Sequence, residues 1–254
     1  MTTISNHASI LPTGLNMMCS TKRRMDNPLL KAILSPLLHS IAKRYVKGSA
    51  KNNLTFGVVD NLQKWEKIRS LRLSEYNEIL PYMTDVLNED GTDLYDSRSV
   101  VFGLWDAEKA IATIRFTAAP YEFSCFLSPE ENKKSLESLY TSTTVEFSRL
   151  IVARKTPYKG VLQALIIFAG LNILCFTDYR HYIGYTKLGV FKKLKKFAIT
   201  DLDIRFSIPS RGEHSYCMLC GNFRNDVALL VKKIMPNPFP FFSPKRLAEA
   251  DNEH

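Results

Sequence analysis

The chain has 254 residues, of which 45% are hydrophobic and 23% charged, a composition that excludes a fibrous or wholly disordered protein and favours a soluble globular one. Its formal net charge of +9 favours an acidic or phosphate-bearing partner, and nucleic acid, anionic lipid, a cofactor and an acidic carrier protein all qualify. Five cysteines at irregular spacing favour free thiols in a reducing compartment over a disulfide framework, so we expect a cytoplasmic protein.

The first 53 residues differ from the rest and are expected to form a basic, partly helical extension. The opening ten residues have neither the basic start nor the apolar core of a secretory signal. Residues 28–48 then place Leu and Ile at helical spacing among Lys and Arg, which predicts a helix that Pro36 interrupts or kinks. We favour packing of this helix on the main domain. The alternative is a peripheral contact with the inner membrane surface.

From residue 54 the elements follow a readable order. Residues 54–59 predict a short strand, and Asp60 is the expected N-cap of a helix that runs to about Leu80, where Pro81 ends it. A polar loop over 88–98 separates this helix from two strands, 100–105 and 110–117. The tight turn between these strands predicts a hairpin.

Residues 120–142 are polar and irregular and are expected to form an inserted loop. The run VEFSRLIVAR, residues 145–154, is typical of a buried strand, yet it carries Glu146, Ser148 and Arg149. A buried charge is costly unless it is paired or used, so the strand indicates either a structural ion pair or a functional site.

The remaining third alternates apolar segments with turns. Residues 161–176 form an apolar run shorter than the roughly 20 residues that span a bilayer, and we predict a helix that stops at Gly170, followed by a strand over 173–177. A helix over 181–196, a hairpin of strands 202–208 and 215–220, and a last helix from 224 complete the order. His214, Cys217 and Cys220 are too few for zinc, which generally takes four ligands, so no metal is expected.

This order predicts an α/β (α+β) fold in which helices cover both faces of a mixed sheet. The expected main domain spans residues 54–222. Residues 223–254 are expected to add a C-terminal helix and a tail rich in Pro and Phe.

Several motifs between residues 69 and 154 follow one another in a recognisable order. They are Arg72 with Tyr76 and Tyr82, the loop Asp93-Leu94-Tyr95-Asp96, Arg115 on a strand, and Glu146-Phe147-Ser148-Arg149. Their order and spacing resemble the acyl-homoserine-lactone synthases and the related N-acyl amino acid synthases, which have the GNAT acyltransferase fold. The resemblance covers about residues 54–208 and implies a central sheet that is splayed open.

The chain departs from the family pattern in two places. Gly91 stands where the family usually has an acidic residue, and Tyr76 and Tyr82 stand where Phe and Trp are more common. These positions shape the pocket for S-adenosylmethionine in the lactone synthases. An amino acid or another small amine is therefore as plausible an acceptor as S-adenosylmethionine.

The resemblance implies an N-acyltransferase that moves a fatty acyl group from the thioester of an acyl carrier protein, or of CoA, to the amine of a small acceptor. That acceptor would be an amino acid or a homoserine-lactone precursor. Glu146 would assist deprotonation of the amine, and Ser148 shares its strand face. Tyr182 would supply the acid for the leaving thiolate. Six residues would bind the acceptor: Arg72, Tyr76, Tyr82, Asp93, Asp96 and Arg115.

The thioester donor would contact the backbone of the strand predicted over residues 145–154. In the GNAT fold a bulge lets backbone N–H groups of this strand contact the pantetheine arm and the thioester oxygen, which implies that role for Leu150, Ile151 and Val152. Arg149 points to the opposite face of a regular strand unless a bulge re-aims it, and it is grouped with the donor. The phosphate would meet the helix start through Arg154, Lys159 and Gly160.

The phosphate-binding turn retains few of the glycines that acetyl-CoA users show, which favours the phosphopantetheine of an acyl carrier protein, with no permanently bound cofactor. Two alternatives are a non-catalytic GNAT-like binding protein and a basic membrane-surface module. No signature of a nucleic-acid-binding motif is present, so no nucleic acid is expected as a partner.

Overall fold

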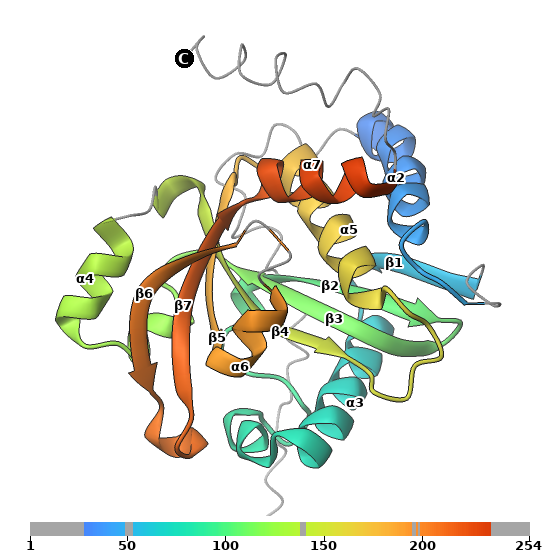
Figure 1. Ribbon diagram of the computed structural model, residues 1–254. Coiled ribbons are helices and arrows are strands. Elements are labelled where there is room, and N and C mark those ends of the chain that lie inside the picture. The colour runs from blue at the N-terminus through green and yellow to red at the C-terminus, as the bar shows by residue number, and fades with distance from the viewer. Residues whose placement is uncertain (1–27, 49–52, 138–140, 195–196, 198, 235–254) are drawn as a thin grey trace, which may run out of the picture.

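The computed structural model describes residues 28–48, 53–137, 141–194, 197 and 199–234 (Figure 1). The basic start of the extension and the Pro- and Phe-rich end lie outside these residues. The main helices are α2 Pro28–Lys43, α3 Leu62–Ile79, α4 Pro129–Glu137, α5 Val161–Phe176, α6 Leu188–Leu194 and α7 Phe223–Ile234. The strands are β1 Leu54–Val58, β2 Ser99–Asp106, β3 Lys109–Thr117, β4 Thr144–Val152, β5 His181–Lys187, β6 Thr200–Ser207 and β7 Ser215–Asn222.

The seven strands form one mixed sheet in the order β1-β2-β3-β4-β5-β7-β6. Neighbouring strands are antiparallel except for β4 and β5, which run parallel. The β4–β5 pairing covers only Thr144–Glu146 against His181–Ile183, so the two strands separate beyond Glu146. This geometry confirms the predicted mixed and splayed sheet.

Helices cover both faces of the sheet. In Figure 1, α2, α5 and α7 lie together over one face, and α3 lies across the other. We call the first the α5 face and the second the α3 face. On the α5 face, Phe168 of α5 packs against Phe56 and Phe102 of the sheet. On the α3 face, Trp65 and Ile68 of α3 are buried.

The apolar run of residues 161–176 is a single helix, so the predicted stop at Gly170 and the strand over 173–177 are wrong. Gly170 lies within α5, where an added Cβ would come within 2.9 Å of Val227, so the glycine allows α7 to pack closely. The helix ends at Thr177, whose backbone is extended (φ −136°, ψ 169°) and whose N–H and hydroxyl both donate to the carbonyl of Ile173, at 3.0 and 2.7 Å. Within the described ranges, no helix is both long and apolar enough to cross a bilayer.

The predicted helix over 181–196 is also wrong in its first half. Residues 181–187 form β5, and only Leu188–Leu194 are helical. The sequence HYIGYTK is rich in aromatic and β-branched residues, which suit a strand with a neighbour on each side. The predicted fifth strand therefore lies one element too early in the sequence.

Two helix starts also differ from expectation. The N-cap of α3 is Asn61, one residue after the predicted Asp60, and its side chain accepts the N–H of Lys64 at 3.0 Å. The predicted irregular insert contains α4, which begins at a reciprocal pair. Ser128 Oγ accepts the N–H of Glu131, and the Glu131 carboxylate accepts the N–H of Ser128 at 2.9 Å.

Helix α2 packs against α5, and Leu38, Ile41 and Ala42 are buried in the main core. This is the packed arrangement that the sequence favoured. On the outer side of the same helix, Ile33 and Leu37 are 63% and 47% exposed. The described part of the N-terminal extension therefore shares its core with the residues that follow.

Candidate functional site

A bulge in β4 sets the geometry of the candidate site. Arg115 pairs with Ser148 and Thr113 pairs with Ile151, so two residues of β4 stand opposite one residue of β3. Arg149 in this bulge has a φ of 51°, in the left-handed region. Its side chain therefore reaches the α3 face of the sheet, together with that of Glu146, whereas a regular strand would place it on the opposite face.

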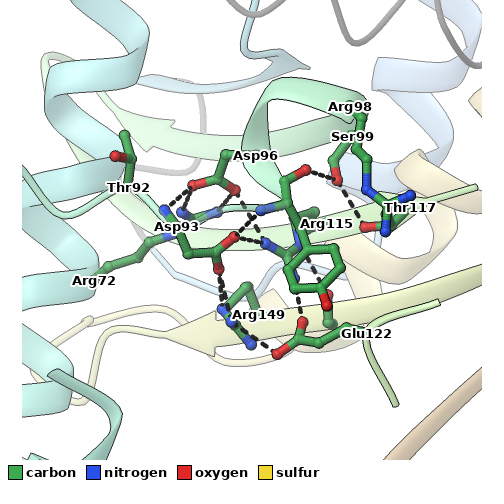
Figure 2. A network of polar contacts seen from close by, with 12 residues as sticks. Arg72, Thr92, Asp93, Asp96, Arg98, Ser99, Arg115, Thr117, Glu122 and Arg149 are labelled. Atoms are coloured by element: carbon green, nitrogen blue, oxygen red, sulfur yellow. Dashed lines mark hydrogen bonds and ion pairs between the residues drawn. The ribbon is translucent and has the colours of Figure 1, made fainter. Parts of the chain in front are cut away.

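Next to this bulge, arginines and carboxylates form a buried network (Figure 2). Arg72 of α3 binds both carboxylate oxygens of Asp96, at 2.5 and 3.1 Å. Arg115 of β3 and Arg149 of β4 both bind Asp93, the second with a 2.7 Å bond from Nε. All five side chains are at most 5% exposed. The network therefore ties α3, the acidic loop and two central strands together.

The acidic loop uses its own carboxylates to hold its backbone. Asp96 accepts the N–H of Asp93 at 2.9 Å, and Asp93 accepts the N–H of Tyr95 at 2.8 Å. Burial opposes ionisation of Asp93, but the guanidinium groups of Arg149 and Arg115 hold the pKa of its carboxyl well below the usual range. Asp93 is therefore a permanent anion at the centre of the network.

Glu122 completes the network, although it is not among the residues predicted for the site. It is 3% exposed, and its carboxylate binds Arg115 and also Arg149, the latter at 3.0 Å. The residue lies in the segment expected to be an irregular loop. The available signal was its position between Tyr121 and Phe123, two aromatic residues that are both buried.

Glu146 lies beside Glu122 but has a different environment. It is fully buried, and it accepts the backbone N–H groups of Glu122 and Phe123, the second at 3.2 Å. No arginine forms an ion pair with it among the described residues. Burial, together with the charge of Glu122, raises the pKa of Glu146 to about 8. Near pH 7 this carboxyl therefore remains largely protonated.

The other residues predicted on the α3 face lie at different distances from this centre. The hydroxyl of Ser148 accepts a 2.9 Å bond from Arg115 Nε, which makes it a support for that arginine. Tyr76 is buried among the arginines, and burial raises its pKa although Arg149 and Arg72 oppose the rise. Tyr82 lies further out, where Lys187 Nζ is 4.9 Å from the centre of its ring.

Tyr182 lies on the α5 face of the sheet, so the structure does not bring it together with Glu146. Its hydroxyl donates to the carboxylate of Asp226 on α7, and burial followed by this charge raises its pKa far above the usual value. The expectation rested on placing the fifth strand at 173–177. Because β5 begins at His181, Tyr182 is within the strand and its side chain points away from the network.

An apolar cavity of about 40 Å³ lies on the α5 face, directly behind the bulge. Phe147 and Leu150, the two β4 residues that point away from the network, form one wall. Helices α5 and α7 contribute Ile166 and Val227, and Tyr182 and Asp226 supply the polar atoms at its edge. The bulged strand therefore separates an apolar cavity from a charged network.

The residues predicted to meet the donor's phosphate are only partly gathered. Gly160 has a φ of 80° and begins α5, as predicted for the helix start. The backbone of Lys159 exchanges two 3.0 Å hydrogen bonds with Lys47, and the carbonyl of Tyr45 lies against Gly160. The N-terminal extension thus borders the position where a phosphate was expected.

Arg154 points away from that helix start and forms ion pairs with Glu78 and, at 3.6 Å, with Glu75. It borders a polar hollow of about 830 Å³ between α3 and the end of the β2–β3 hairpin. Lys109 and Lys155 also line this hollow. No group of three or more His, Cys, Asp or Glu side chains is placed to hold a metal ion in the described part of the chain.

No protein-family model and no curated protein sequence matches the chain. Solved structures do match its fold. The AHL synthase LasI superposes with a TM-score of 0.52 at 14% identity, over 71% of this chain and 94% of that one. TofI, in a complex with an inhibitor and MTA, gives 0.53 at 13% identity, over 75% and 100%.

BjaI, a CoA-dependent acyl-homoserine lactone synthase solved with SAM and isopentyl-CoA, gives a TM-score of 0.50 at 14% identity, over 65% of this chain and 80% of that one. At these identities the likeness concerns the arrangement of the backbone. The chain therefore has the GNAT-like fold of the acyl-homoserine-lactone synthases.

Proposed function

We propose that the protein is an N-acyltransferase that moves a fatty acyl group from a thioester to the amine of a small acceptor. One observation carries the proposal. Glu146, a buried carboxyl with a pKa of about 8, lies at the residue where β4 and β5 separate. The charged network lies on one side of this strand and the apolar cavity on the other. The proposal places the polar acceptor on the side of the network and the acyl chain on the side of the cavity.

The thioester arm would enter between the separated strands, with the start of its acyl chain in the cavity of about 40 Å³ behind Phe147 and Leu150, which would widen to admit a longer chain. The backbone N–H groups of Leu150 and Val152 would stabilise the oxyanion that forms when the amine attacks the thioester carbon, while the strand register turns that of Ile151 toward β3. Such donors are commonly worth about 3 kcal/mol each.

Glu146 would take the amine proton, directly or through a water molecule, once its own proton has left. Collapse of the tetrahedral intermediate breaks the C–S bond and releases a thiolate. Because a free thiol has a pKa of about 8.5, a carboxyl with a pKa of about 8 is well matched to return the proton to sulfur. General catalysis of this kind contributes about 10²- to 10⁴-fold in rate.

We propose an acyl carrier protein as the donor, with CoA as the alternative. The net charge of +9 and the few glycines before α5 support the carrier protein. The isopentyl-CoA bound by BjaI supports CoA, since that synthase shares the fold. Exposed Ile33 and Leu37 on α2 support a peripheral membrane contact, which would bring the enzyme close to lipid.

Mass spectrometry of lipids from bacteria that express the protein tests the proposal. New N-acyl amines should appear with the wild type and be lost with Glu146→Gln in a folded protein. Glu108→Gln, at a side chain that is 82% exposed, is the matched control and should leave the products unchanged. Full product with Glu146→Gln would refute the role of Glu146. Absence of product from the wild type would favour a binding protein.

A further inference from the structure

Arg211 is a buried arginine without a hydrogen-bonded carboxylate. It ends the short 3-10 helix Pro209–Arg211 between β6 and β7 and is 3% exposed. Its Nη1 donates to the hydroxyl of Tyr185 at 2.9 Å. Its Nε and Nη2 donate to no acceptor among the described residues, and the closest carboxylate oxygen, on Glu122, is 3.7 Å from Nη2. Buried donors are nearly always paired, so these two indicate a missing partner.

The side chains around Arg211 present further donors. The buried hydroxyls of Tyr82 and Tyr216 lie close to each other, and beyond this contact neither has a hydrogen-bond partner among the described residues. Burial, with a contribution from the nearby Tyr82 hydroxyl, raises the pKa of Tyr216 to about 12, so it keeps its proton. Lys187 lies over the Tyr82 ring at 4.9 Å. A group that accepts hydrogen bonds and carries negative charge would suit these donors.

The charges of the network also leave room for an anion. Four buried guanidinium groups belong to it, those of Arg72, Arg115, Arg149 and Arg211. Three carboxylates form ion pairs with them, those of Asp93, Asp96 and Glu122. Glu146 adds no charge while it is protonated, so one positive charge is in excess, and Arg211 has the weakest carboxylate contact of the four. An unbalanced buried charge is costly, and a bound anion removes that cost.

We propose that Arg211, with the hydroxyls of Tyr82 and Tyr216, binds a carboxylate of the acceptor. The acceptor is then an amine that carries a free carboxylate, such as an amino acid. This inference rests on the proposed acyl-transfer function. The Nε and Nη2 atoms of an arginine together form the fork that a carboxylate accepts with two parallel bonds.

The position of Glu122 supports this assignment. Its carboxylate is 3.7 Å from Arg211, and its backbone N–H donates to Glu146. Glu122 is therefore the single residue between Arg211, at the proposed carboxylate site, and Glu146, the base proposed for the amine. The site also lies close to the surface, because residues 212–215 are exposed and Tyr82 and Lys187 are half-buried.

Matched acceptors test the proposal on the full-length protein. The twenty amino acids are first screened with decanoyl thioesters of CoA and of an acyl carrier protein. The best acceptor is then compared with its carboxamide and its decarboxylated amine. We expect the wild type to prefer the carboxylate by at least about tenfold in kcat/KM, and Arg211→Gln to raise the KM for the amino acid roughly 10- to 100-fold while the amide is unaffected.

Two further variants keep the test decisive. Tyr216→Phe removes a hydroxyl whose described contact is with the Tyr82 hydroxyl, and it empties little space, so the variant should fold and raise the KM for the amino acid alone. Arg205→Gln, at a half-exposed arginine paired with Asp201, is the control and should change nothing. Equal use of amide and amino acid by the wild type, or an unchanged preference in both Arg211→Gln and Tyr216→Phe, would overturn the proposal.

A binding measurement separates this proposal from the function on which it rests. Thermal stabilisation by N-decanoyl amino acids is compared with that by their amides. If no acceptor is acylated, the proposed function fails, and stabilisation by the carboxylates alone, lost in Arg211→Gln, still supports the site. Equal stabilisation by both, or none by either, would overturn it.

Discussion

The raised pKa of Glu146 predicts an unusual dependence of stability on pH. The folded protein holds a proton on this carboxyl up to about pH 8, whereas the unfolded chain releases it near the ordinary glutamate pKa of 4.5. Between these values the folded state binds more protons than the unfolded state, so the free energy of unfolding falls as pH rises. Each pKa unit is worth 1.36 kcal/mol, so Glu146 alone should remove about 4 kcal/mol across this window.

Glu146→Gln isolates this contribution, because the amide stays neutral at every pH. Near pH 5 the variant should be less stable than the wild type by about 1–3 kcal/mol, since its NH₂ group must face one of the two backbone N–H donors from Glu122 and Phe123. Above about pH 8 the order should reverse, because only the wild type then buries an unpaired charge.

Urea unfolding measured from about pH 5 to about pH 9 tests this prediction. The quantity of interest is the difference in unfolding free energy between the two proteins, in which the contributions of other titrating groups cancel. The difference should shrink with rising pH and change sign. A constant difference across the range would mean that Glu146 titrates normally in the folded protein, and the reasoning from its burial would be refuted.

Three further changes have defined outcomes. Arg72→Met should cost about 3–5 kcal/mol in urea unfolding, because it leaves the buried Asp96 with one weaker arginine contact, to Arg115. Arg205→Met, at the half-exposed pair with Asp201, should cost about 1 kcal/mol or less, and equal costs would contradict the burial argument. Val227→Phe should fill the apolar cavity and shift the acyl products toward shorter chains. An unchanged product profile by mass spectrometry would mean that the acyl chain does not bind in this cavity. Gly160→Ala should lower the free energy of unfolding by at least about 1 kcal/mol, because a Cβ at a φ of 80° would meet the carbonyl of Tyr45 in the N-terminal extension. An unchanged melting temperature would argue against that contact.

Local signals in the sequence predict those helices and strands that have a clear hydrophobic period or are joined by a tight turn. The β2–β3 hairpin follows from two apolar runs around a tight turn, and α3 follows from its cap and Pro81. Residues 161–176 carry no period, because α5 is buried between the sheet and two other helices and is apolar on all sides. Without a hydrophobic period to follow, Gly170 resembles the end of a helix in the sequence alone. The strand β5 depends on two partners that are distant in sequence.

The candidate site was predictable where its residues belong to the resembling motifs. Asp93, Arg115 and Glu146, which belong to these motifs, are buried in or beside one network, and their roles toward substrates remain predictions. Glu122 and Arg211 come from connecting segments without a hydrophobic period, and the aromatic neighbours Tyr121 and Phe123 are the one local sign that Glu122 is buried. Their roles depend on a charge balance that exists only after the strands assemble.

The most direct test of the account is the pH dependence of acyl transfer by the purified protein, measured as amide formed and thiol released from a decanoyl thioester in the presence of an amine. Because Glu146 acts as a base only after it loses its proton, kcat/KM should rise with pH and level off above about pH 8. Glu146→Gln should show a much lower rate without that rise. Equal rates for the two proteins at all pH values, or no thiol release with any amine, would contradict the claim that this buried carboxyl serves acyl transfer.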